Sequence, residues 1–291
     1  MSRDPNTARQ VWRRLELLHA VTYFSPEPIG LLKDAGYKGF WMGYFAGRAA
    51  PLGAVGPEVV SALFYNFADA RVRKAVPDAW SFAGPVVALD ARLVGSIAAL
   101  RRALGDMADS PETAEIASLA RRAAESAPVE GRALFAANAA LPWPDEPLAV
   151  LWHGATLLRE HRGDGHVAVL TAAGIRGREA NVLHAVSVNA PREFMTIGRD
   201  YDDVEWASNV KSLADRGLMT SDGQLTAEGA ALKADVESQT DRAALSAYER
   251  LSDDELNGLS ARLGPLARAV AATGDFPPMT PIGPIADVSD V

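Results

Sequence analysis

Ionisable side chains crowd one stretch, LLREHRGDGHVA at 157–168, although apolar residues lie on both sides of it. Arg159 and Arg162 are three positions apart, so on a helix their guanidinium groups share a face and can bind a carboxylate or phosphate bidentately. His161 or His166 could move a proton near neutral pH. This combination predicts a polar site that binds an anion and could support acid–base chemistry.

Part of the stretch also has a purely structural interpretation. A helix ending near Arg162, a turn at Gly163 and a cap from Asp164 for the following helix would use several of these residues. That interpretation leaves the surplus of charges unexplained, so we keep His161, His166 and Asp164 as catalytic candidates. It places His161 and Arg162 at an exposed helix end, where replacement by alanine should change stability little.

Partners for this stretch are expected in the first part of the chain. Arg48 lies in YFAGRAAPLG (44–53) among apolar neighbours, so its charge needs a carboxylate, a ligand anion or access to solvent. The aromatic ALFYNF (62–67) is typical of a core, but buried tyrosine hydroxyls need polar partners. The ligand-binding candidates are Tyr23, Tyr44, Arg48, Tyr65, Asn66, His153, Arg159 and Arg162, around a pocket between two halves of the chain.

Other catalytic classes fit less well. There is no cysteine, so a metal would need His153, His161 and His166 with Asp164, and their spacing matches no standard metal motif. No Gly-x-Ser-x-Gly element for a serine nucleophile occurs. We predict no metal site, assign no cofactor and leave open whether the protein is an enzyme.

The composition is that of a soluble globular protein of 291 residues, with 48% hydrophobic residues and a net charge of −8. No run of eighteen uncharged apolar residues occurs, so we expect a cytoplasmic protein without membrane contact. The negative charge makes nucleic acid an unfavoured partner, although a local basic patch would escape that argument. The oligomeric state is left open.

An internal repeat organises the chain. An offset of 138 positions places LLKDAGYKG (31–39) on VLTAAGIRG (169–177) without a gap, and later helical patterns stay in the same register. In the second copy a helix at 177–186, a helix starting at Asp202 and Asp222-Gly223 turn residues precede another helix. This order predicts a mainly α fold, a tandem winged helix-turn-helix pseudo-dimer with small β-hairpins.

Two resemblances support this architecture. Residues 213–229 resemble the wing region of MarR-type regulators. The whole chain resembles a group of mainly actinobacterial helix-turn-helix proteins for which no activity is established, through LHAVTYF (18–24), YFAGRAAPLG, ALFYNF and LLREHRGDGHVA. The resemblances imply an architecture and no reaction. We divide the chain into a first winged-helix-like copy (1–105), a helical linker (106–146), a second copy (147–245) and a C-terminal region (246–291), which holds a terminal helix or a helix pair broken near Pro265 and then a loose Pro-rich tail from 273 on. Ser110 in the linker and Ser252 in the C-terminal region have the residue patterns of helix N-caps.

The distribution of charged residues argues against a conventional DNA-binding protein. Residues 199–242 contain five basic and ten acidic side chains, whereas 61–104 contain six basic and three acidic ones. Only the first copy has the positive charge to approach DNA, whereas a symmetric operator is normally bound by two equivalent DNA-binding units. We therefore expect a protein that binds a small molecule with an anionic group between its halves. One alternative is a ligand-responsive DNA-binding transcription regulator. Another is an adaptor that binds a partner protein through the acidic helix starting at Asp202.

Overall fold

The computed structural model describes residues 3–280 and 283–284, and nearly all regular secondary structure in this part of the chain is helical. The first part contains α1 (Pro5–Phe24), α2 (Pro26–Asp34), α3 (Gly39–Ala49), α4 (Pro57–Leu63), α5 (Asp69–Ala75), α6 (Ala79–Phe82), α7 (Pro85–Leu104), α8 (Pro111–Ser126) and α9 (Ala133–Ala139). The second part contains α10 (Pro147–Ala172), α11 (Gly177–Ser187), α12 (Arg192–Arg199), α13 (Asp203–Asp215), α14 (Ala227–Leu245) and α15 (Asp253–Ala271). Short 3₁₀ turns at Ala50–Leu52, Gly105–Asp109 and Ser246–Tyr248, and the two-residue strands β1 (Met279–Thr280) and β2 (Gly283–Pro284), complete it.

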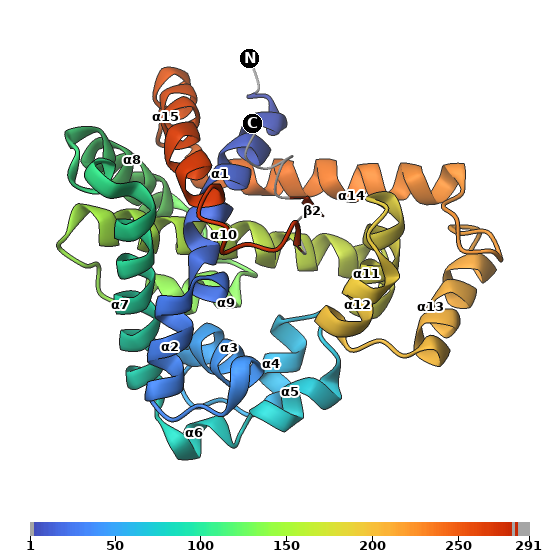
Figure 1. Cartoon of the computed structure of the whole chain (residues 1–291). Helices are drawn as coiled ribbons and strands as arrows, with labels where there is room; N and C mark the ends of the chain where they lie inside the picture. Colours follow the sequence, from blue (N-terminus) through green and yellow to red (C-terminus); the bar gives the residue numbers. More distant parts are fainter. Residues whose placement is uncertain (1–2, 281–282, 285–291) are drawn as a thin grey trace.

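Helix α10 lies at the centre of the molecule, in contact with α1, α8, α9 and α14 (Figure 1). The largest apolar core joins α10 to α1, α7, α8 and α15 through residues such as Leu15, Leu100, Ile116, Trp152 and Leu259. Two smaller apolar cores are separate from this one. We call them the first lobe, α2–α6 around Phe45, and the second lobe, α11–α13 around Leu183 and Leu213.

The expected turn within LLREHRGDGHVA is wrong, because α10 runs unbroken through it. Its glycines provide room rather than a turn: a Cβ on Gly165 would lie 2.6 Å from Nη1 of Arg132. Leu148, Trp152 and Leu158 are buried around the helix. A helix packed on most sides has no exposed face for charged residues, so its polar groups are buried too.

The expected β-hairpins are largely absent from the described residues. In the second half the hairpin is reduced to one antiparallel bridge between Met219 and Leu225, and the equivalent place in the first half holds the short helix α6. The named strands β1 and β2 lie in the C-terminal segment. The described chain is therefore mainly α, as expected, but without developed wings.

Helices of the two halves nonetheless occur at corresponding positions. Helices α3 and α11 have the same length and begin 138 positions apart, at Gly39 and Gly177. Each follows the same helix ending, in which the N–H of Tyr37 bonds to the C=O of Leu32 and that of Ile175 to the C=O of Leu170. Gly36 and Gly174 supply the positive φ that this ending requires.

The helix starts predicted from capping residues agree with the structure better than the predicted turns do. Side chains of Ser110, Asp202 and Ser252 cap α8, α13 and α15 as their sequences predict. Of the two alternatives for the C-terminal region, the single helix is confirmed and the break at Pro265 is wrong, because α15 continues through it. The predicted loose tail, 273–291, falls partly on residues 281–282 and 285–291, which lie outside the described residues.

Within the described residues, no single helix combines the length and apolar character of a membrane span. One sharply bent pair, Asp69–Phe82 with Pro85–Asp109, reaches them by length and composition alone.

Candidate functional site

A cavity of about 610 Å³ lies between the two lobes and is bounded on its other side by α1, α10 and α14. This is a usual volume for a small-molecule site. Nine of the eleven predicted site residues line it: Tyr23, Tyr44, Arg48, Tyr65, Asn66, Arg159, Arg162, Asp164 and His166. Residues more than a hundred positions apart in the sequence therefore meet at one cavity.

His161 and His153 do not lie with the others. His161 is fully buried, stacks edge-on against Phe135, and has no hydrogen-bond partner at either ring nitrogen among the described residues. His153 packs against Trp143 in the main core. Neither ring lines the cavity, so the geometry does not support an acid–base role for His161 there.

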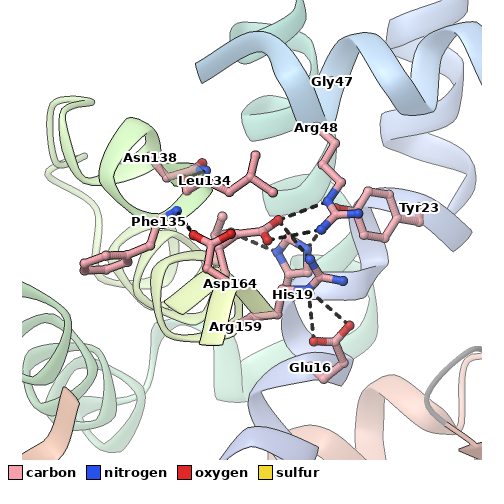
Figure 2. A network of polar contacts seen from close by, with 12 residues as sticks. Glu16, His19, Tyr23, Gly47, Arg48, Leu134, Phe135, Asn138, Arg159 and Asp164 are labelled. Carbon is pink, nitrogen blue, oxygen red and sulfur yellow. Dashed lines mark hydrogen bonds and ion pairs between the residues drawn. The ribbon is translucent and has the colours of Figure 1, made fainter. Parts of the chain in front are cut away.

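Arg48 and Arg159 belong to a buried ion network centred on Glu160. Glu160 accepts hydrogen bonds from Nε and Nη2 of Arg48, both at 3.2 Å, and lies 2.8 Å from Nη1 of Arg159. Arg159 also bonds to Glu16, as Figure 2 shows. Burial alone would raise the pKa of Glu160, but Arg159 and Arg48 hold it well below its usual range. The carboxylate that Arg48 was expected to need is thus supplied by α10.

Arg162, three positions further along α10, is held in a similar way. Its Nη2 lies 2.7 Å from Oδ1 of Asp241 on α14, and its guanidinium covers the ring of Trp12. Arg9 bonds to the second oxygen of Asp241. The expected exposed helix end is wrong for Arg162, which is 6% exposed.

Asp164 caps a helix, but not the one expected. It accepts a hydrogen bond from the N–H of Phe135 in the first turn of α9, at 2.9 Å (Figure 2). Burial raises the pKa of Asp164 to about 6. Its carboxyl group both caps the N-terminus of α9 and borders the cavity.

Tyr23 is held by a chain of hydrogen bonds from the core. The Thr156 hydroxyl donates its proton to the C=O of Trp152, so its oxygen can only accept from Nδ1 of His19, 2.9 Å away. Nε2 of His19 is therefore the unprotonated nitrogen and accepts from the Tyr23 hydroxyl at 3.1 Å. Tyr23 consequently offers only oxygen lone pairs to the cavity.

The lobes touch at Tyr65 and Asn66. The Tyr65 hydroxyl donates to the C=O of Ile175 at 2.5 Å, and the side-chain amide of Asn181 donates to the C=O of Asn66. A Cβ on Gly177 would lie 1.9 Å from the carbonyl oxygen of Tyr65. The Tyr65 hydroxyl thus has a structural partner, whereas the side-chain amide of Asn66 has none among the described residues.

Arg199 is the functional candidate that the sequence pattern missed. It ends α12, lines the cavity, is 9% exposed and lies over the ring of Phe67. Within the described chain, its guanidinium makes one hydrogen bond, to the neighbouring C=O of Gly198, and pairs with no carboxylate. Burial lowers its pKa to about 10, so it remains a cation. The sequence around Arg199 did not indicate an unpaired charge, because the acidic residues that follow it suggest a ready carboxylate partner.

The cavity is cationic although the whole chain is acidic. Its lining includes only three carboxylates, those of Glu16, Asp164 and Glu237. Against them stand seven cations: Arg9, Arg13, Arg48, Arg159, Arg162, Arg199 and Lys233. Counting Glu160 and Asp241, which pair with lining arginines from behind, two positive charges remain in excess.

Most of the basic residues counted at 61–104 are engaged in ion pairs within the protein. Arg71 binds Asp200, Arg73 binds Glu58 and Asp69, and Arg92 is buried against Asn138. Arg101 and Arg102 pair with carboxylates as well. Of the six basic residues counted at 61–104, only Arg92 and Lys74 lack a carboxylate partner within the described chain, and Arg92 is buried.

The described residues contain no group of three or more His, Asp or Glu side chains arranged to hold a metal ion. Among known families, the model of one described as a helix-turn-helix family matches residues 8–277. Neither the curated proteins nor the solved structures gave a match with this chain.

Proposed function

Because the chain belongs to this helix-turn-helix family, we propose that it is a small-molecule-binding member whose cavity holds a ligand with an anionic group. The observation that carries the proposal is Arg199, a buried guanidinium that lines the cavity without a carboxylate. A buried charge is costly unless it is paired, and a ligand anion would supply the pair.

Groups near Arg199 can complete an anion site. Arg48, close enough to lower the pKa of Arg199 by repulsion, adds positive potential. Tyr44 and Asn66 line the same cavity, and neither the Tyr44 hydroxyl nor the Asn66 amide has a hydrogen-bond partner in the described chain. The walls are aromatic, with Phe64 and Phe67 among them. An anion attached to an apolar or aromatic body fits this lining.

The lining favours binding over acid–base catalysis. Burial lowers the pKa of His166 to about 4, so its ring is a weak base, and His161 lies outside the cavity. We therefore assign no reaction to the site.

The two halves would enclose the ligand as a pseudo-dimer in one chain. This proposal is supported by the equal lengths of α3 and α11, by their common offset and by the matching helix endings before them. An experimental structure in which the backbones of these two segments fail to superpose would overturn it.

A second candidate function is a transcription regulator whose DNA affinity changes with the ligand. Membership of a helix-turn-helix family favours it, because such elements commonly read DNA. The ion pairs of Arg71 and Arg73 in the first half and the excess of acidic residues at 199–242 count against it.

The test of the anion site compares two arginines on one helix. Arg199→Met should lose binding of aromatic carboxylates, measured by calorimetry after native mass spectrometry has shown whether the purified chain carries a ligand. It should also keep or raise the thermal midpoint, since an unpaired buried charge is removed. Arg192→Met is the control, because Arg192 pairs with Asp203 outside the cavity. Unchanged carboxylate affinity in Arg199→Met would overturn the proposal.

A further inference from the structure

His166 presents a hydrogen-bond acceptor of fixed identity to the cavity. Its Nδ1 lies 2.9 Å from the hydroxyl oxygen of Thr240 on α14. That hydroxyl donates its single proton to the C=O of Val236 at 2.7 Å, so its oxygen can only accept. Nδ1 of His166 must then carry the proton, and Nε2 keeps its lone pair.

The tautomer is protected by its surroundings. Thr240 is fully buried, so no solvent competes for its hydroxyl, and the ring of His166 lines the cavity. Nε2 has no hydrogen-bond partner within the described chain. Burial lowers the pKa of His166 to about 4, and the charges of Glu237, Arg162, Lys233 and Asp241 around it do not reverse that shift. The ring is therefore neutral near pH 7.

A second acceptor faces the same cavity. The Tyr23 hydroxyl is committed to Nε2 of His19, which leaves only its lone pairs for a ligand. Tyr23 and His166 come from different helices, α1 and α10. The cavity thus combines cations, which favour an anion, with two neutral acceptors, which favour O–H or N–H donors.

We infer that the ligand of this cavity carries a hydroxyl or N–H donor in addition to its anionic group, and that Nε2 of His166 accepts a hydrogen bond from that donor. The inference rests on the proposed anion site and narrows its ligand class. Thr240 is a positioning residue, since it acts only through the tautomer of His166.

The first measurement needs no ligand. Long-range ¹H–¹⁵N spectra of the full chain, labelled at histidine, should show Nδ1 of His166 protonated and Nε2 unprotonated near neutral pH. A spectrum with Nε2 protonated would overturn the inference whatever the cavity binds.

The second measurement uses three matched probes, 2-naphthoate, 6-hydroxy-2-naphthoate and 6-methoxy-2-naphthoate. The hydroxyl compound should bind roughly three- to tenfold more tightly than the other two, the range for one neutral hydrogen bond. The preference should vanish in His166→Leu and shrink in Thr240→Val. It should persist in His166→Gln, whose amide oxygen can replace Nε2, and in the control His153→Gln outside the cavity.

The outcomes separate the two proposals. Equal binding of all three probes overturns the donor inference and leaves the anion site standing. Failure of all three to bind removes the anion site and this inference with it. If His166→Leu does not fold, the tautomer spectrum and Thr240→Val still decide.

Discussion

Asp164 on α10 caps α9 from outside, because its carboxylate accepts a hydrogen bond from the N–H of Phe135 at 2.9 Å. Asp164→Ala should therefore lower the free energy of unfolding by about 1 kcal/mol, the usual effect of losing a cap. Asp164→Asn keeps an accepting oxygen and should be at least as stable as the unaltered protein at about pH 7. Urea unfolding of the three proteins measures the differences, and equal losses in both variants would contradict the capping role.

The same carboxyl group predicts a pH dependence. Burial raises the folded-state pKa of Asp164 to about 6, above the unfolded value of about 3.9. The folded protein then takes up a proton first, so the contribution of Asp164 to stability rises as the pH falls from about 7 to about 4. Any stability advantage of Asp164→Asn should shrink over that range. An advantage that grows toward low pH would show the opposite shift.

His161 should behave as a core residue and not as a surface one. Its ring fills space against Phe135 without a hydrogen bond, so His161→Ala leaves a cavity and should cost about 2–4 kcal/mol. His161→Leu fills most of that space without unsatisfied nitrogens and should cost far less. Both should bind a carboxylate ligand like the unaltered protein once folded. Denaturation and calorimetry test this pair, and a larger loss in the leucine variant would contradict it.

Glu160 should be among the most sensitive positions. Glu160→Gln leaves Arg48 and Arg159 buried with one carboxylate, Glu16, and should cost about 3–5 kcal/mol. Because its folded pKa lies below the unfolded value, Glu160 stabilises the protein at neutral pH and this contribution is lost in acid. Glu125→Gln, which breaks an exposed pair with Arg121, should change stability by less than about 1 kcal/mol. Similar losses in both variants would contradict the prediction.

Generic duplex DNA should bind weakly. Arg71, Arg73, Arg101 and Arg102 of the first half are engaged in ion pairs, and Asp202 and Asp203 lie at the start of α13, the helix that a winged helix-turn-helix arrangement would place in the major groove. Fluorescence anisotropy with random-sequence duplex at about 150 mM salt should give a Kd weaker than micromolar. Tighter binding would refute the prediction and favour the regulator hypothesis.

Sequence reasoning worked where the signal was local or chemical. Caps at Ser110, Asp202 and Ser252 are local hydrogen bonds, and they were predictable from a few residues. An arginine among apolar neighbours identified Arg48 because its charge demands a partner. The partners themselves, such as Glu160, come from helices far away in the sequence and could not be assigned by pattern.

The errors at 157–168 share a physical origin in α10. Glycine normally predicts a turn, but here Gly154 and Gly165 let Ala120 and Arg132 approach the helix closely. Tertiary packing outweighs the low helix propensity of glycine, which amounts to about 1 kcal/mol per residue. Polar residues in such a helix are buried, and for that reason exposure at 161 and 162 was predicted wrongly.

The continuity of α10 sets a fixed scale along the cavity. Arg159, Arg162 and His166 lie on one unbroken helix, where each residue advances about 1.5 Å, so about 10 Å of axis separates the first from the last. A turn at Gly163 would have let that spacing vary as the backbone bent. The rigid helix instead fixes the distance between the Arg159 ion network and the histidine acceptor, so this wall of the cavity cannot lengthen or shorten to fit molecules of different lengths.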